Sequence, residues 1–394
     1  MNRFKVKDAQ SKSVGNTFGS ILFVIVSYTV LIVLLSSCSS DLSIQREVQQ
    51  VQEEGVISTN YSIVFIIHGD SEYLFHDTDG NEYKADEDVL AQAKKVAQQN
   101  SQAEVFIFHQ KPRWHFLFLS PFRDGEFYYY RNGQLIANES YWRDQEQSQF
   151  EPEVELYRRS RLENKREMTN VFLYFGHQIP EFGGVGYDES YPDRSFTVHD
   201  FAAGLKAFTS DSARFDLMIL STCFGGTPFT INALGSYGRT IIASPENLHL
   251  SYFNLHLLEN LDLGLHDGNM SAFAKIFARQ AFDRLTEYVQ TSVSIGVYDM
   301  VQTREYLYSV REIYENTLTD LNRETKDSML SLERCDCADL SGYNLPTINK
   351  GVDIFYRAAS FGRSKNKQNH SGWECWKEIG SPDKTPNNSG TIKK

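Results

Sequence analysis

The segment 215–226 reads FDLMILSTCFGG, in which an apolar run of strand length leads directly to Cys223. A continuous apolar run of this length is typical of a strand that is covered on both faces of a sheet. A second run, VFLYFGH, ends in the same way at His177. A thiol attacks as a thiolate, and a nearby imidazole can take its proton. If the two strands belong to one sheet, Cys223 and His177 therefore favour nucleophilic catalysis by a Cys/His pair.

Further apolar runs and helical patterns surround this pair. Buried strands are predicted at 61–68, 104–109, 171–175, 215–220 and 240–243. Apolar residues at helical spacing predict a helix over about 88–99 with Asp86 as its N-cap, and Thr197 is expected to cap a helix that ends at Phe208. Strands that alternate with helices predict an α/β fold with a mostly parallel sheet and helices on both faces.

Other segments are expected to decorate this core. A small hairpin is predicted over 72–84, and an antiparallel pair is inserted over 113–145, with a type I′ turn signal at Asn132-Gly133. Residues 146–169 are charged and expected to be exposed. The pattern beyond the core predicts amphipathic helices over 270–289 and 304–332, a late strand over 352–356 and a disordered tail over 380–394.

Composition bounds the class of protein and its partners. The chain has 394 residues, of which 41% are hydrophobic, and this is ample for a large core. Its formal net charge is −12, and the first 37 residues carry more cations than anions, so the rest is more acidic still. An acidic surface repels phosphate backbones and argues against a nucleic-acid partner. No organic cofactor is implied by the sequence.

The N-terminus is typical of a targeting segment. A basic stretch precedes an apolar run, which ends in LSSC at Cys38 and resembles a bacterial lipobox. Residues 1–37 are therefore predicted to be a lipoprotein signal peptide, Cys38 the lipidated residue and 38–60 a polar tether. An uncleaved anchor helix is the alternative, although the run is short for a span of about 20 residues. Either reading predicts an exported, membrane-tethered protein of the cell envelope, at the outer membrane if the cell has one.

Three further cysteines lie near the C-terminus. An exported protein permits disulfides, so Cys335 or Cys337 could pair with Cys375, and three free thiols are the alternative. No second ligand pair with the spacing of a zinc site follows Cys335 and Cys337, so no metal site is predicted from them.

The loops after the two strands carry features suited to stabilising an oxyanion. Active groups of open α/β sheets gather at the carboxyl ends of the strands, where Cys223 and His177 are expected. Glycines follow both residues and leave backbone amides accessible. The N–H of Cys223 and an amide beside His177, from Gly176 or Gln178, are the expected donors to a developing oxyanion.

At this point the sequence resembles the clostripain family of cysteine peptidases, within the wider caspase-like clan. The resemblance covers about 61–262, and the spacing from His177 to Cys223 is close to the roughly 50 residues of caspases. It rests on a series of motifs in a set order, namely the strand that ends at His177, GYD at 186–188, FTVHDFAAGL at 196–205, ILSTCFG at 219–225 and IASPEN at 242–247.

The resemblance implies a caspase-like three-layer α/β sandwich with an inserted β-hairpin. Its catalytic core would span 61–262, and a C-terminal helical extension over 263–379 would complete the fold. The expected activity is that of a monomeric endopeptidase acting on peptide or protein substrates, with Cys223 as the nucleophile and His177 as the proton carrier. The residues expected around the oxyanion and the substrate are Gly176, Gln178, Ser221, Phe224 and Glu246.

Two positions depart from the family pattern. Gln178 follows the histidine where the clan usually has glycine, and Ser221 stands where the family usually has the aspartate of a pocket for basic side chains. These departures favour a rival hypothesis, a non-catalytic relative that serves as a surface binding module. A third hypothesis is a metal-dependent hydrolase at the strand-end histidines. For His68 and His109 the favoured interpretation is that they satisfy the polar rim of the sheet.

Overall fold

The structure is a computed structural model, and the residues that it describes all lie within the unit Ser58–Lys394. The described residues are 59–69, 74–76, 82–113, 122–143, 150–162, 168–181, 183–209, 214–248, 253–261, 269–308, 350–362 and 365.

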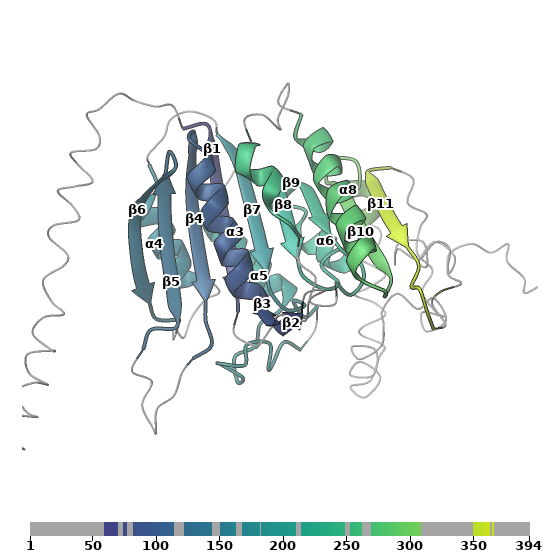
Figure 1. Cartoon of the computed structure of the whole chain (residues 1–394), viewed down its shortest axis with the longest axis horizontal. Coiled ribbons are helices and arrows are strands. Elements are labelled where there is room, and N and C mark those ends of the chain that lie inside the picture. Colours follow the sequence, from purple (N-terminus) through teal and green to yellow (C-terminus); the bar gives the residue numbers. More distant parts are fainter. Residues whose placement is uncertain are drawn as a thin grey trace, which may run out of the picture. The chain divides into compact units, whose positions relative to one another are not determined.

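A mixed sheet organises these residues (Figure 1). Its nine described strands lie in the order β11-β10-β9-β8-β7-β1-β4-β5-β6. Their bounds are β1 Tyr61–His68, β4 Ala103–Gln110, β5 Gly125–Arg131, β6 Gln134–Tyr141, β7 Thr169–Phe175, β8 Phe215–Ser221, β9 Gly238–Ala243, β10 Val293–Asp299 and β11 Val352–Arg357. A separate small hairpin, predicted over 72–84, joins β2 Leu74–His76 to β3 Glu82–Lys84.

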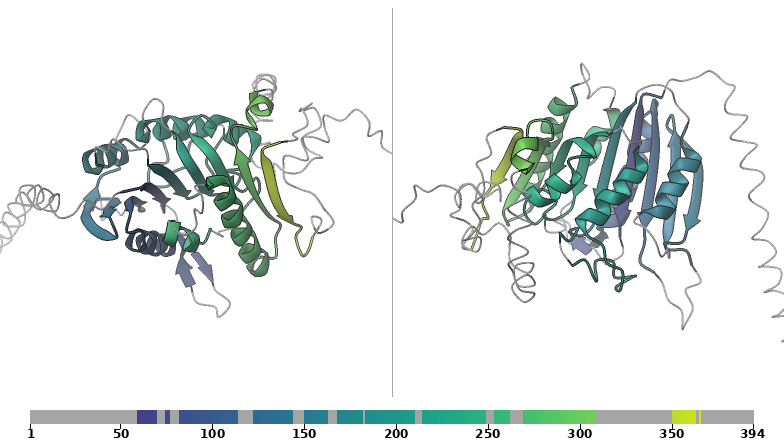
Figure 2. Two further views of the ribbon diagram at one scale, coloured as in Figure 1. Left: turned by 90° about the horizontal axis from the view of Figure 1, so that it is seen from above. Right: turned by 180° about the vertical axis from the view of Figure 1, so that it is seen from behind.

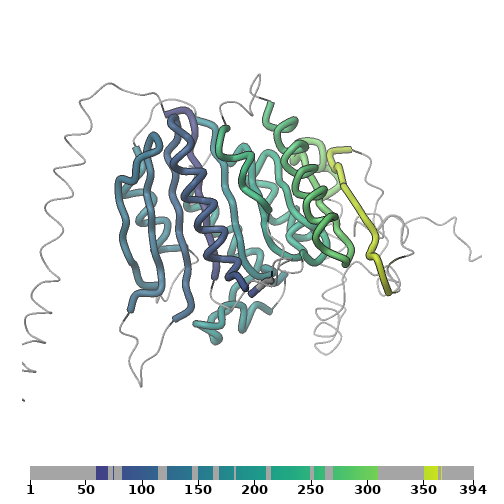
Figure 3. The backbone as a smooth tube through the Cα atoms, viewed as in Figure 1, coloured from purple at the N-terminus to yellow at the C-terminus, as the bar shows by residue number. Residues whose placement is uncertain are grey.

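The centre of the large sheet is parallel. Strands β4, β1, β7, β8 and β9 pair in parallel, while β5 and β6 on one side and β10 and β11 on the other pair antiparallel. From β1 the chain first adds β4 on one side. It later adds β7, β8 and β9 in turn on the other side of β1. All five parallel strands therefore point their carboxyl ends at the same edge of the sheet, as the arrows in Figure 1 indicate. The tube view follows the chain across this sheet from the purple and blue strands to the green and yellow ones (Figure 3).

Side-chain alternation explains why both faces of the sheet are covered. In β7, Val171, Leu173 and Phe175 join one core cluster, whereas Phe172 and Tyr174 join the other. Helices α3 Ala85–Gln99 and α8 Met270–Tyr288, with the short 3₁₀ helix η1 His256–Asn260, cover the first face. Helices α4 Glu151–Ser160, α5 Val198–Phe208 and α6 Pro228–Leu234 cover the second (Figure 2). The predicted three-layer α/β sandwich with a mostly parallel sheet is confirmed.

Two local predictions are confirmed in detail. Thr197 caps α5 through a capping box with Asp200, whose backbone N–H and carboxylate take part in reciprocal bonds. Asn132 and Gly133 have φ angles of 52° and 81°, as a type I′ turn between β5 and β6 requires.

Two predictions on the N-terminal half are wrong. Helix α3 begins at Ala85, so Asp86 is not its N-cap but lies in its first turn, where the carboxylate binds His109. The segment 146–169 was expected to be exposed, but it contains α4, whose Val154, Leu156 and Tyr157 are buried against the second face of the sheet. Pro152 and the surrounding charges obscure the apolar stripe of this short helix.

The region after residue 262 supplies strands as well as helix. The predicted helix over 270–289 and the strand over 352–356 correspond to α8 and β11. Strand β10 was not predicted; it pairs antiparallel with β9 and with β11. Several predictions concern residues outside the described ranges, namely the signal peptide expected over 1–37, Cys38, most of the helix expected over 304–332, Cys335, Cys337, Cys375 and the disorder expected over 380–394. Within the described part of the chain, no helix has the length and hydropathy to cross a membrane.

Candidate active site

The register of the sheet places the two predicted catalytic residues at neighbouring strand ends. Strands β7 and β8 are parallel neighbours, and Phe175 is paired with Ser221. His177 and Cys223 each lie two residues beyond this pair, so they leave the same edge of the sheet at the same level. Neighbouring strands are about 4.8 Å apart. His177 is exposed and Cys223 is partly exposed, so both can meet a solute.

Hydrogen bonds keep the two strand ends together beyond the sheet. The hydroxyl of Thr222 donates to the carbonyl oxygen of His177 at 2.6 Å. The N–H of Gly176 donates to the carbonyl oxygen of Ser221 at 3.4 Å. Because Thr222 directly precedes Cys223, this bond holds the backbone at His177 close to the backbone at Cys223.

A buried carboxylate joins the two loops a second time. Glu181, 5% exposed, follows His177 in the first loop. It accepts a hydrogen bond from the hydroxyl of Thr227 at 2.5 Å and a longer one from Thr230 at 3.4 Å. Thr227 is the N-cap of α6, which begins directly after the Cys223 loop. Sequence reasoning did not find Glu181, and the Thr227-Pro228 start of α6 is the nearest sequence signal.

The turn that follows Cys223 is held against the loop after β9. Phe224 has a positive φ of 53°, an uncommon conformation for a residue with a side chain. Its N–H donates to the carbonyl oxygen of Glu246 at 3.0 Å, and the N–H of Gly226 donates to that of Ser244 at 2.8 Å. The amide of Phe224 therefore already has a hydrogen-bond partner within the protein.

The sulfur of Cys223 contacts the same loop. Its S–H donates to Asn247 Oδ1 at 2.8 Å, and the N–H of Leu248 donates to Sγ at 3.3 Å. Asn247 was not among the predicted site residues. The sulfur thus donates to a side-chain carbonyl oxygen and accepts from a backbone amide.

The other predicted site residues have structural contacts. Ser221 is buried, and its hydroxyl accepts a hydrogen bond from the N–H of Phe253 at 3.1 Å. Gly176 lies where an added Cβ would be 2.4 Å from the hydroxyl of Tyr174 and 2.9 Å from Cβ of His68, so only glycine fits. Gln178 is half-buried, and Glu246 is buried.

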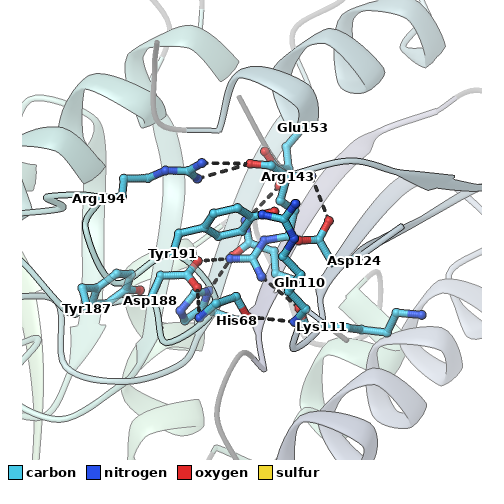
Figure 4. A network of polar contacts seen from close by, with 12 residues as sticks. His68, Gln110, Lys111, Asp124, Arg143, Glu153, Tyr187, Asp188, Tyr191 and Arg194 are labelled. Carbon is cyan, nitrogen blue, oxygen red and sulfur yellow. Dashed lines mark hydrogen bonds and ion pairs between the residues drawn. The ribbon is translucent and has the colours of Figure 1, made fainter. Parts of the chain in front are cut away.

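A buried polar network anchors the loop that follows His177 (Figure 4). The guanidinium of Arg143 donates to Asp188, and the N–H of Arg143 donates to Asp124 at 3.0 Å. Tyr191 donates its hydroxyl to the same aspartate, Asp124, at 2.5 Å. Arg143, Asp124 and Asp188 are each 5% exposed or less. The network therefore connects the exit of β6 to the loop between β7 and α5.

The strand-end histidines have protein partners, as the polar-rim interpretation predicts. His68 Nδ1 donates to Gln110 Oε1 at 2.7 Å, and its ring stacks on that of Tyr187 with centroids 4.9 Å apart. His109 Nε2 donates to Asp86 at 2.9 Å, and Nδ1 lies 3.8 Å from Glu126. Among the described residues, no cluster of three or more His, Cys, Asp and Glu side chains is arranged to hold a metal ion.

His109 and Glu126 influence each other's titration. Burial alone would lower the pKa of His109, but the hydrogen bond to Asp86 and the charges of both carboxylates outweigh it and raise that pKa. The His109 imidazole, helped by hydrogen bonds from Lys111 and Tyr128, lowers the pKa of Glu126 well below its usual range.

Neither the protein-family models nor the curated proteins contain a match to this chain. Solved structures of C11 cysteine proteases are similar to it. They include an inactive zymogen of a C11 protease from Parabacteroides distasonis, at 12% identity and a TM-score of 0.45, with 65% of this chain and 66% of that chain covered. They also include a secreted C11 cysteine protease from Bacteroides thetaiotaomicron in complex with an irreversible peptide inhibitor, at 12% identity and a TM-score of 0.46, with 66% and 71% covered. A further structure of a secreted C11 protease from that organism, iotapain, has 11% identity and a TM-score of 0.46, with 66% and 72% covered. C11 is the clostripain family, the family that the sequence resembles.

Proposed function

We propose that this chain is a cysteine endopeptidase that uses a Cys223/His177 dyad. The observation that carries the proposal is the register of β7 and β8, in which both residues lie two positions beyond the pair Phe175–Ser221. The hydrogen bond from Thr222 to the His177 carbonyl supports it, because it ties the two strand ends together. The resemblance of the sequence motifs to the clostripain family indicates the same reaction.

The proposed reaction is acyl transfer through a thioester. His177 takes the proton of Cys223, and the thiolate attacks the scissile carbonyl carbon to form a C–S bond. His177 then gives the proton to the leaving amine as the C–N bond breaks. Water, deprotonated by His177, hydrolyses the thioester and regenerates the thiol. The N–H groups of Cys223 and Gln178 are the proposed donors to the oxyanion.

The proposed specificity does not include a strong preference for basic side chains. Ser221 replaces the aspartate that the family uses near that pocket, and its hydroxyl accepts a hydrogen bond from Phe253. A neutral hydroxyl offers a substrate guanidinium or ammonium far less electrostatic attraction than a carboxylate does. Peptides with neutral P1 residues are therefore expected to be processed at least as well as those with arginine.

The experiment is hydrolysis of a peptide library by the purified protein and two variants. Cys223→Ala and His177→Ala should each lower kcat/KM by at least about 10³-fold, because each removes a reacting group. His256→Ala is the matched control, since this histidine is 70% exposed on η1, and its activity should equal that of the parent. Full hydrolysis by Cys223→Ala would disprove the mechanism.

The rival function is a surface binding module without catalysis, and Gln178 and Ser221 are the residues that favour it. The same library separates the two. Peptides that bind the parent protein and the Cys223→Ala variant equally, and that neither of them cleaves, would support the module.

We further propose that the protein is exported and tethered to a membrane by lipid on Cys38. The basic leader, the apolar run and the LSSC motif support this assignment. In the native host, a Cys38→Ser variant should lose the lipid-dependent partition into detergent phase that the parent shows. Equal partition of the two proteins would contradict the tether.

A further inference from the structure

We propose that Asn247 is a second side chain of the reacting site, which accepts the S–H of resting Cys223 and donates an N–H to the thiolate once the proton has left. The proposal rests on the proposed role of Cys223 as nucleophile. Asn247 lies in the loop after β9 and belongs neither to the Cys223/His177 dyad nor to the proposed oxyanion donors.

Direct contact with the reacting atom is the first observation. Asn247 Oδ1 lies 2.8 Å from Cys223 Sγ, and the N–H of the next residue, Leu248, points at the same sulfur from 3.3 Å. Two consecutive residues of one loop therefore contact Sγ, one through a side-chain carbonyl and one through a backbone amide.

The loop that presents Asn247 is fixed on both sides. Leu248 is 7% exposed and its side chain belongs to the core cluster under α3 and α8. On the other side, the N–H groups of Phe224 and Gly226 donate to the carbonyl oxygens of Glu246 and Ser244. Asn247 is thus held between a buried leucine and a pair of backbone hydrogen bonds, and its reach to Sγ does not depend on a free loop.

Close packing at Gly226 makes this frame stiff. A Cβ added to Gly226 would lie 2.8 Å from the backbone nitrogen of Pro245 and 2.9 Å from the carbonyl carbon of Ser244. The hydroxyl of Tyr298 in β10 also donates to the carbonyl oxygen of Gly226 at 2.9 Å. The backbone at Gly226 packs directly against the backbone at Ser244 and Pro245, so the turn after Cys223 and the loop that contains Asn247 are held in a fixed relative position.

A primary amide suits both protonation states of a thiol. Its carbonyl oxygen accepts from S–H, and its NH₂ group can donate to S⁻ after a half-turn about the last side-chain torsion. Hydrogen bonds to a charged group are stronger than those between neutral groups. Asn247 therefore stabilises the thiolate more than the thiol, and the amide of Leu248 acts in the same direction.

The test measures the thiol itself. The rate of alkylation of Cys223 by iodoacetamide is followed as a function of pH, with mass spectrometry of the peptide that contains Cys223, in the full-length protein and in two variants. Asn247→Ala removes the amide without adding charge, so the apparent pKa of Cys223 should rise. Asn247→Asp places a carboxylate beside the sulfur, so the apparent pKa of Cys223 should rise further, by at least about one unit. The rate of alkylation near pH 7 should then fall about tenfold.

The matched control is Asn138→Asp. Asn138 is exposed on β6, at the far edge of the sheet from β8, so the same change of charge there should leave the titration of Cys223 unaltered. If both Asn247 variants titrate like the parent protein, the proposal is overturned. Circular dichroism shows whether Asn247→Asp folds. If it does not, the proposal is tested by Asn247→Ala alone, in which the apparent pKa of Cys223 should rise by a smaller amount, and an unchanged pKa would overturn it.

These outcomes are separate from the fate of the peptidase. A shifted titration in a protein that cleaves no peptide would support the contact while refuting the enzyme. Peptide hydrolysis by the parent protein, together with an unshifted titration of Cys223 in the Asn247 variants, would support the enzyme and refute the role of Asn247.

Discussion

At the scale of single residues, the segment from Ser221 to Gly226 positions one thiol through four neighbours with distinct tasks. Ser221 accepts a hydrogen bond from Phe253, and Thr222 binds the carbonyl of His177. Phe224 adopts a positive φ of 53°, which turns the chain sharply after Cys223. Backbone in such a sparsely populated region persists only where its surroundings enforce it. Here the hydrogen bond from Phe224 to Glu246 and the contact at Gly226 do so.

Thr222 provides a test at this scale. Thr222→Val keeps the shape of the side chain but removes the donor to His177 O, which should lower the free energy of unfolding by about 1–2 kcal/mol. Activity should fall about tenfold or more, because a small displacement of His177 relative to Cys223 is costly in acyl transfer. Urea unfolding and kcat/KM measure the two effects.

Thr209→Val is the control for that variant. Its hydroxyl also donates to a backbone carbonyl, that of Lys206 at 3.2 Å, but at the end of α5. It should change stability only slightly and leave kcat/KM intact. Equal loss of activity in both variants would show that Thr222 has no special role in placing His177.

The sequence predicted the strand-end residues but not the residues that hold them. Cys223 and His177 are recognisable because each terminates an apolar run, a local pattern. Asn247, Glu181 and Thr222 act through contacts between loops that are far apart in the chain, and no spacing rule marks such contacts. Asn247 even lies within the quoted motif IASPEN, yet nothing in that motif says that its side chain meets the sulfur.

At the scale of elements, a cluster of titratable residues joins α3, β4 and β5. Asp86 from the first turn of α3 binds His109 at the end of β4, and Glu126 from β5 lies close to the same ring. Lys111 and Tyr128 donate to Glu126 at 2.5 and 2.7 Å. The acidic first turn of α3 also complements the positive end of its helix dipole. Asp86 therefore connects the helix to the sheet instead of capping it.

This cluster predicts a pH dependence of stability. Because the folded pKa of His109 is raised above its ordinary 6.5, its contribution is complete below that pH and is lost as the pH rises through the folded value. Because the folded pKa of Glu126 is lowered from 4.5, its contribution is present above that pH and is lost as the pH falls through the folded value. Both contributions are complete only between these limits.

The measurement compares the parent protein with His109→Gln by urea unfolding near pH 5.5 and pH 8.5. The parent's advantage in free energy of unfolding should be larger at about pH 5.5. Thr209→Val, which removes no titratable group, should show no such change between the two pH values. An advantage that grows towards about pH 8.5 would mean that His109 is stabilised in its neutral form.

The elements that sequence analysis missed share a physical cause. Helix α4 is short and charged, and it is stabilised by burial of Val154, Leu156 and Tyr157 against the sheet rather than by its own propensity. Strand β10 contains Gly296, which weakens a strand signal, and here a Cβ would meet the ring of Tyr298. Tertiary packing decides both elements, whereas the long apolar central strands are evident from sequence alone.

At the scale of the whole described unit, the inserted hairpin β5–β6 does more than widen the sheet. Arg143, two residues after β6, enters a buried network with Asp188 and Asp124 (Figure 4). Asp188 lies in the loop that begins at His177, and Glu181 ties that loop onward to the start of α6. The hairpin thus supports, through a chain of polar contacts, the loop that carries the proposed catalytic imidazole. The sequence predicted the hairpin but not this connection, because Arg143 and Asp188 meet only in the folded protein.

The last prediction concerns the energetic coupling of Arg143 to Asp188. Arg143→Met removes the cation while leaving two buried carboxylates, Asp188 and Asp124, so it should lower the free energy of unfolding by about 3–5 kcal/mol. Asp188→Asn in the same background removes one of those carboxylates, so the double variant should be more stable than the sum of the two single losses by about 1 kcal/mol or more. Urea unfolding of the four proteins gives this coupling energy. The exposed pair of Arg159 and Glu139, 2.6 Å apart, is the control, and Arg159→Met should cost less than about 1 kcal/mol. If the two single losses of unfolding free energy add exactly in the double variant, Arg143 and Asp188 are not coupled, and the hairpin and the His177 loop are stabilised independently. In a coupled buried pair, removing one partner must change the loss of unfolding free energy caused by removing the other.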